Sequence, residues 1–209
     1  MFVAISTVAE NGSAGGRTQE NYGVNVRATS EADIDPTLLR EGENSASSIF
    51  AGIHVRLTWT DQLPSHSPQP TRCGSETPTG HLLLQIVPHA PANVSHVALA
   101  MAMPYADSGV RVIVFYDRVD LLLGGEFAPE GRILGYVLAH EIAHVLQGIS
   151  RHSETGVMRA RWTATDLRLM GIGALQFAKE DVQLIWRRFD HLPTSAGCSG
   201  FPEGIMQER

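Results

Sequence analysis

Hydrophobic and polar positions alternate with two different periods along this chain, and the change of period predicts where strands and helices lie. Alternating runs at 22–28 and 54–60 predict two strands, and apolar residues at helical spacing predict a helix between them. That helix begins at Asp35-Pro36, because proline fits the first turn of a helix, and it ends at Gly52. A strand, a helix and a strand in this order indicate that the two strands are parallel.

The rest of the chain predicts three more strands and three more helices. Proline, Ser, Thr and Gly at 61–80 are typical of a long surface loop. The predicted strands cover 81–88, 97–103 and 110–116, of which the last is the clearest and the middle one the weakest. The predicted helices cover 131–147, 163–171 and 179–189, and Thr163 to Asp166 resembles a capping box. This order favours an α+β fold, with a mixed twisted sheet packed on the first helix and on the helix at 131–147.

Length and charge limit the number of domains and the classes of partner. We expect residues 1–21 to be a flexible lead-in, 22–192 to form one domain and 193–209 to be an irregular tail. Sixteen basic residues against twenty-two acidic ones leave a net charge of -6, which favours neither nucleic acid nor an anionic membrane as a partner. No stretch approaches the ~20 apolar residues that span a bilayer. We expect a monomer.

The strongest chemical signal is the segment His140-Glu141-Ile142-Ala143-His144 inside the helix predicted at 131–147. Two histidines four residues apart lie about 40° apart around a helix and about one turn along it, so both imidazoles can reach one metal ion. Glu141 lies beside them and is placed to take a proton from zinc-activated water. The pattern therefore predicts a catalytic zinc site, although the HExxH spacing by itself also recurs by chance in helices.

A third ligand is needed to complete a catalytic zinc site with one open position. Gly148 can end the helix in a left-handed conformation and turn the chain back, and His152 follows closely enough to return to the metal. The alternative is that His152 is a solvated loop residue and that Asp166 or Glu180, from the later helices, is the third ligand.

These residues resemble the metzincin group of the zincin metalloproteases, whose pattern is HExxHxxGxxH followed by a methionine-containing turn. The chain matches at the two helical histidines and the glutamate, and then has its glycine one position late and its third histidine two positions late, as HExxHxxxGxxxH. Val157-Met158 is similar to the Met-turn, and a group of small predicted zincins shares the later His-Ser and a tryptophan, here Trp162. The resemblance implies a zincin-like fold, with Met158 beneath the metal.

Together the residues and the resemblance predict a zinc metalloendopeptidase with a peptide or protein substrate. Two rivals remain: a zincin-fold protein that binds zinc without hydrolysis, and a hydrolase of small amides. The family resemblance also implies that an extended peptide pairs with an edge strand, for which 97–103 is a candidate. Tyr105 and Tyr116 are candidates for the oxyanion partner by residue type alone.

The cysteines and the N-terminus leave the location open. Cys73 and Cys198 could form a disulfide or remain free thiols, and Thr71-Arg72-Cys73-Gly74 is similar to the inhibitory cysteine motif of matrix metalloproteases. A secreted or periplasmic location is favoured, although the apolar start lacks a basic region and no signal peptide is clearly present.

Overall fold

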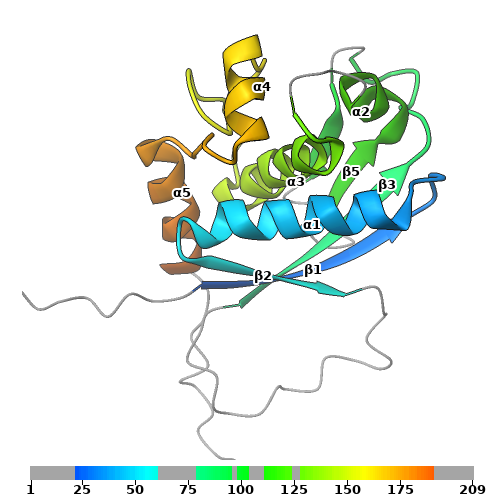
Figure 1. Cartoon of the computed structure of the whole chain (residues 1–209). Helices are drawn as coiled ribbons and strands as arrows, with labels where there is room; N and C mark the ends of the chain where they lie inside the picture. Colours follow the sequence, from blue (N-terminus) through cyan, green and yellow to red (C-terminus); the bar gives the residue numbers. More distant parts are fainter. Residues whose placement is uncertain (1–21, 61–78, 96–97, 104–110, 124–127, 191–209) are drawn as a thin grey trace, which may run out of the picture.

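The computed structural model describes residues 22–60, 79–95, 98–103, 111–123 and 128–190 (Figure 1). Five strands form one sheet in the order β2-β1-β3-β5-β4. Neighbouring strands are parallel except β4, which pairs antiparallel with β5 at the edge. The strands are β1 (Tyr22–Ser30), β2 (Val55–Thr60), β3 (Thr79–Val87), β4 (Ala100–Met103) and β5 (Arg111–Phe115).

Five helices accompany this sheet in the described ranges, which gives them a mixed α/β architecture. Figure 1 shows α1 and α3 packed against each other over one face of the sheet. A mixed sheet under these two helices is what the sequence predicts at this coarse level, but its mostly parallel order is closer to α/β than to α+β. The helices are α1 (Pro36–Ala51), α2 (Tyr116–Leu123), α3 (Glu130–Gln147), α4 (Ala164–Gly171) and α5 (Lys179–Asp190).

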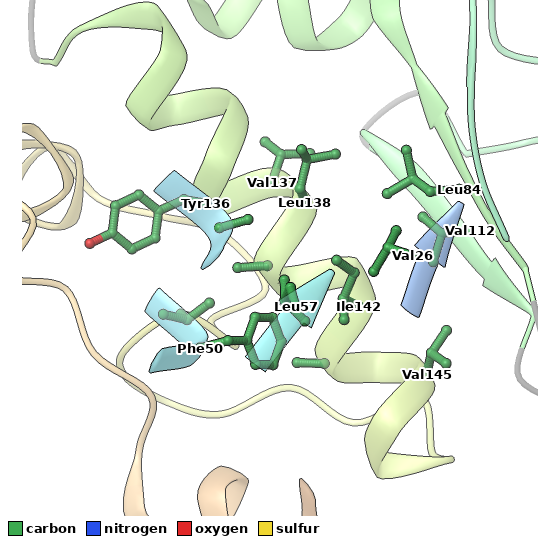
Figure 2. Close-up of a cluster of buried hydrophobic side chains, with 14 of the residues drawn as sticks. Val26, Phe50, Leu57, Leu84, Val112, Tyr136, Val137, Leu138, Ile142 and Val145 are labelled. Atoms are coloured by element: carbon green, nitrogen blue, oxygen red, sulfur yellow. The ribbon is translucent and has the colours of Figure 1, made fainter. Parts of the chain in front are cut away.

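Alternation along the strands decides which face of the sheet meets the helices. In β1 the burial alternates residue by residue, with Tyr22, Val24 and Val26 turned into the core. Figure 2 shows Val26, Leu84 and Val112 from three neighbouring strands close to side chains of α3. The sheet's apolar face therefore forms the support for α3.

Local signals fix the ends of α1 and α4 as the sequence predicts. Asp35 caps α1 by accepting a hydrogen bond from the Thr37 backbone N–H at 2.7 Å, and Pro36 follows at the first helical position. The capping box of α4 is present, since Thr163 and Asp166 each accept a hydrogen bond from the other's backbone N–H. The predicted parallel pairing of β1 and β2 is also confirmed.

Three sequence predictions differ from the structure. The strand predicted at 110–116 ends at Phe115, and Tyr116 begins helix α2, which the sequence analysis did not predict. Strand β3 begins at Thr79, inside the predicted loop, of which 61–78 lie outside the described residues. The weak strand predicted at 97–103 begins only at Ala100.

Helix α3 is the structural centre of the molecule. Every residue of it except Glu130 and Arg132 is buried, because the sheet, α1, α2, α4 and α5 all pack around it. Within the described part of the chain, no helix has the length and apolar character of a membrane span. The predicted domain limits at 21 and 193 fall at or beyond the edges of the described residues and remain predictions.

Candidate metal centre

Helix α3 places both histidines of the HExxH motif on one buried face. His140 and His144 are 8% and 9% exposed, and their Nε2 atoms lie 3.1 Å apart. The two rings stand nearly perpendicular, with centroids 4.7 Å apart. The four-residue spacing predicts this convergence, and the structure shows it.

Gly148 ends α3 and turns the chain toward the third histidine. It adopts a left-handed conformation with φ 66°, and its N–H donates to the carbonyl oxygens of His144 and Val145. The ring of His152 then lies 5.3 Å from that of His140 and 4.9 Å from that of His144. One ring nitrogen from each histidine lies within 4.8 Å of the other two. The structure thus brings together all three residues that the sequence selects.

The donor set fits a zinc ion. Two imidazole nitrogens bound to one tetrahedral zinc at about 2.0–2.1 Å would lie roughly 3.3 Å apart, close to the 3.1 Å between His140 and His144. Three neutral imidazoles with one remaining position form a common catalytic zinc site. The cluster could therefore hold such an ion without rearrangement of α3.

A backbone carbonyl orients the His140 ring. Its Nδ1 lies 2.8 Å from the carbonyl oxygen of Val157. Because a carbonyl can only accept, Nδ1 carries the proton, and the lone pair of Nε2 is left for a metal. The same oxygen accepts a second hydrogen bond from Trp162 Nε1 at 3.2 Å, and the Trp162 ring meets His140 edge to face.

The turn that carries Val157 is held rigidly by its own backbone. Gly156 adopts φ +80°, and a Cβ placed there would lie 2.4 Å from the Gln176 carbonyl oxygen. That oxygen accepts a hydrogen bond from the Val157 N–H at 3.0 Å. Met158 is fully buried in the hydrophobic core, and its carbonyl oxygen accepts from the Ser153 N–H at 2.8 Å. Met158 is thus a core residue, whereas its place beneath the metal as a Met-turn residue remains a prediction.

Burial changes the protonation of the site. Burial is the largest effect on His140 and lowers its pKa to about 4, with the neighbouring histidines acting in the same direction. Burial and then the charge of His152 lower the pKa of His144. Both rings are therefore held neutral, which is the form that binds metal ions.

Glu141 lines the same cleft as the three histidines but does not belong to the candidate metal-binding group. It is 8% exposed, and no hydrogen bond or ion pair to its carboxylate is found among the described residues. Burial raises its pKa to about 7. A carboxylate that is kept out of water and has no partner is available for proton transfer.

The three histidines open into a cleft of about 610 Å³. Its lining also includes Ala100, Met101 and Ala102 of β4, the edge strand of the described sheet, and Val137 of α3. Trp162 also lines it. The prediction that 97–103 contains an edge strand is confirmed for residues 100–103, of which 100–102 line the cleft.

The alternative third ligands do not join the cluster. Asp166 is engaged by Thr163 and by Arg159, whose Nη1 lies 3.0 Å from its carboxylate. Burial favours its neutral form, but these hydrogen bonds and the Arg159 charge outweigh burial and lower its pKa. Glu180 is exposed in the first turn of α5 and does not belong to the metal-binding group found in the described part of the chain.

Several other candidates cannot be placed in the cleft. Tyr116 begins α2 and is not among the cleft-lining residues. Tyr105, Cys73 and Cys198 lie outside the described residues. Of the six histidines without ligand-like spacing, His81 and His89 are exposed and His54 lies after α1, while His66, His96 and His191 lie outside the described residues.

Sequence reasoning missed one residue that contacts the site's framework. Asp181 of α5 is fully buried, and its carboxylate accepts hydrogen bonds from both residues that flank His152. Asp181 lies in the first turn of α5, where acidic residues are common because they interact favourably with the helix dipole. The sequence therefore gives no reason to assign it another role. The contact joins residues about 30 positions apart, so no local pattern reveals it.

Comparisons with known proteins give one distant structural likeness. No protein-family model matches the sequence, and no curated protein matches it. Among solved structures, the chain is similar to the crystal structure of archaemetzincin from Methanopyrus kandleri, at 16% sequence identity and a TM-score of 0.45. The match covers 83% of this chain and 98% of that one. At these values the likeness assigns neither a family nor an activity to the chain.

Proposed function

We propose that this protein is a zinc-dependent metallopeptidase of the zincin kind. His140, His144 and His152 would be the zinc ligands and Glu141 the general base. One observation carries the proposal: three imidazole nitrogens within 4.8 Å of one another share a cleft with a buried, unpartnered carboxylate. Gly148 and Met158 would support the site through the turn and the core beneath it.

Zinc is the metal that this donor set favours in a hydrolytic site. Imidazole nitrogen suits zinc, copper, nickel and iron, and a three-histidine set with one open position is typical of catalytic zinc. When bound, zinc would supply a Lewis acid that brings the pKa of water toward 7.

The protein's own groups would perform the proton transfers. The Glu141 carboxylate would accept a proton from the attacking water and later deliver it to the leaving amine. The Val157 carbonyl, 2.8 Å from His140 Nδ1, would keep that ring in the tautomer whose Nε2 faces the cleft.

The edge strand supports a peptide rather than a small amide as the substrate. Among the described strands, β4 pairs with β5 alone, and it borders the cleft. An extended peptide could add to such an edge through main-chain hydrogen bonds, which would lay its backbone across the histidines.

One observation favours a second candidate, a zinc-binding protein without hydrolysis. No tyrosine is found among the described residues that line the cleft. A peptidase at this site would therefore rely on the metal, or on a group outside the described residues, to stabilise the oxyanion.

Metal analysis and peptide digestion on the same samples separate these functions. We expect one zinc per chain and chelator-sensitive cleavage of a peptide library. Glu141→Gln should keep the zinc and lose cleavage, whereas His152→Ala should lose both. Glu154→Gln is the control and should change neither, since Glu154 is an exposed carboxylate two residues after His152. Bound zinc without any cleavage would support the non-catalytic zinc-binding protein. Cleavage confined to small amides would support a small-amide hydrolase. Full cleavage by Glu141→Gln would remove the assigned base.

A further inference from the structure

His152 differs from the other two candidate ligands because it is exposed and lies on a loop. The His152 ring packs against the rings of His140 and His144. No hydrogen bond to the His152 ring is found among the described residues. By contrast, His140 has the Val157 carbonyl and is fixed in a buried helix. The position of the His152 ring therefore depends on the backbone that carries it.

That backbone is attached to one buried carboxylate. Asp181 Oδ1 accepts hydrogen bonds from Arg151 Nη1 at 2.9 Å and from Ser153 Oγ at 2.7 Å, and Oδ2 accepts from Ser153 Oγ at 2.9 Å. Arg151 and Ser153 are the residues immediately before and after His152. Asp181 thus holds the loop on both sides of the third histidine.

The same carboxylate also reaches the helix that carries the other two histidines. Gln147 Nε2, on the last residue of α3 and three positions after His144, donates to Asp181 Oδ1 at 3.3 Å. Asp181 therefore links the end of α3 to the returning loop, across the turn at Gly148. It fixes the distance between the two parts of the metal centre.

The environment makes this link stiff. Asp181 is 0% exposed, and a carboxylate buried to this degree is tolerated only when it is paired and hydrogen-bonded. Charge-assisted hydrogen bonds are shorter and stronger than neutral ones. Movement of the loop would remove the hydrogen bonds from Arg151 and Ser153 and leave the buried carboxylate with the longer one from Gln147, so the loop is held in place.

We propose that Asp181 is a positioning residue for the metal centre, holding His152 at ligand distance through Arg151 and Ser153. The inference rests on the proposed zinc site. Loss of a group that orients a metal ligand costs typically 10- to 100-fold in metal affinity.

The test compares zinc affinity, measured by competition with a chelator, across wild type and three variants. Asp181→Asn, which is nearly isosteric, should lower the affinity of the folded protein about 10- to 100-fold. Ser153→Ala removes hydrogen bonds from the loop side without changing α5, and it should produce a smaller loss in the same direction. Asp190→Asn is the matched control, because Asp190 lies on the same helix and accepts a hydrogen bond from Tyr22 instead. It should bind zinc like wild type.

Cobalt provides a readout that a purely structural role would not change. Co²⁺ loaded into wild type should show the intense visible absorption of a four-coordinate site, and Asp181→Asn should weaken or shift that spectrum. Unfolding of the metal-free variants by urea shows separately how much stability each substitution removes.

The outcomes test the positioning role of Asp181 separately from the proposed zinc-peptidase function. If wild type binds zinc and cleaves peptides while Asp181→Asn and Ser153→Ala, both folded, bind zinc and cobalt as wild type does, the positioning role is wrong and the proposed function stands. If wild type itself takes up no zinc, the proposed function fails and the inference fails with it.

Discussion

Gly156 offers the sharpest test of the link between the backbone and the site. Its φ of +80° costs a non-glycine residue about 1–2 kcal/mol. A Cβ would also lie 2.4 Å from the Gln176 carbonyl oxygen, a backbone atom that cannot swing away as a side chain can. Separation of the two segments would break the hydrogen bond from Val157 N–H to Gln176, worth about 0.5–1.5 kcal/mol.

These contributions add to about 1.5–3.5 kcal/mol of lost stability for Gly156→Ala. For a chain of this length, that corresponds to a fall in Tm of about 3–14 °C. Zinc affinity should fall as well, because the Val157 carbonyl that orients His140 moves with the turn. Urea unfolding of the metal-free protein, followed by far-ultraviolet circular dichroism, measures the stability without any contribution from bound metal.

A second substitution at the same position separates the two causes. Asparagine tolerates the left-handed conformation better than alanine but carries the same Cβ. If the close approach to Gln176 dominates, Gly156→Asn should be nearly as unstable as Gly156→Ala. A loss below about 0.5 kcal/mol in Gly156→Ala would refute the reasoning, since neither the strain nor the contact would then be real.

Two further predictions concern residues around the candidate ligands. Trp162→Phe keeps an aromatic ring near His140 but deletes the hydrogen bond from Nε1–H to the Val157 carbonyl oxygen. Zinc affinity, measured by chelator competition, should therefore fall about 2- to 12-fold. An unchanged affinity would mean that the Val157 carbonyl needs no second donor. Asp166→Asn should keep one zinc per chain and lose about 1 kcal/mol of stability, because Asp166 acts in the helix cap; loss of zinc would instead make it a ligand. Since the folded state lowers the pKa of Asp166 below its ordinary 3.8, this stability difference should be full above that value and shrink as the pH falls through the lower folded pKa.

The sequence predicts those parts of the fold and site that depend on local periodicity. Alternation in β1 and β2, the cap at Asp35 and the glycine turn at Gly148 each follow from a few neighbouring residues, and each is present. The convergence of His140 and His144 is likewise a property of helix geometry. The approach of His152 is predictable because only the short turn after α3 separates it from them.

Features that depend on distant contacts or on backbone atoms carry no such pattern. Helix α2 was not predicted because its polar residues directly follow a strand and look like a solvated strand end. The carbonyl of Val157 orients His140, but any residue type has a carbonyl. Asp181 meets Arg151 and Ser153 only because α5 packs against the end of α3.

The near-complete burial of α3 has a consequence for how an ion would reach and leave the candidate metal centre. A helix enclosed on every side opens to solvent only when the whole fold opens, so its amide protons should exchange among the slowest in the molecule. His140 and His144 should therefore keep their relative positions whether or not an ion is bound, and solvent reaches the centre past the exposed His152. An ion bound at this centre should enter and leave from the side of His152 without any unfolding of α3.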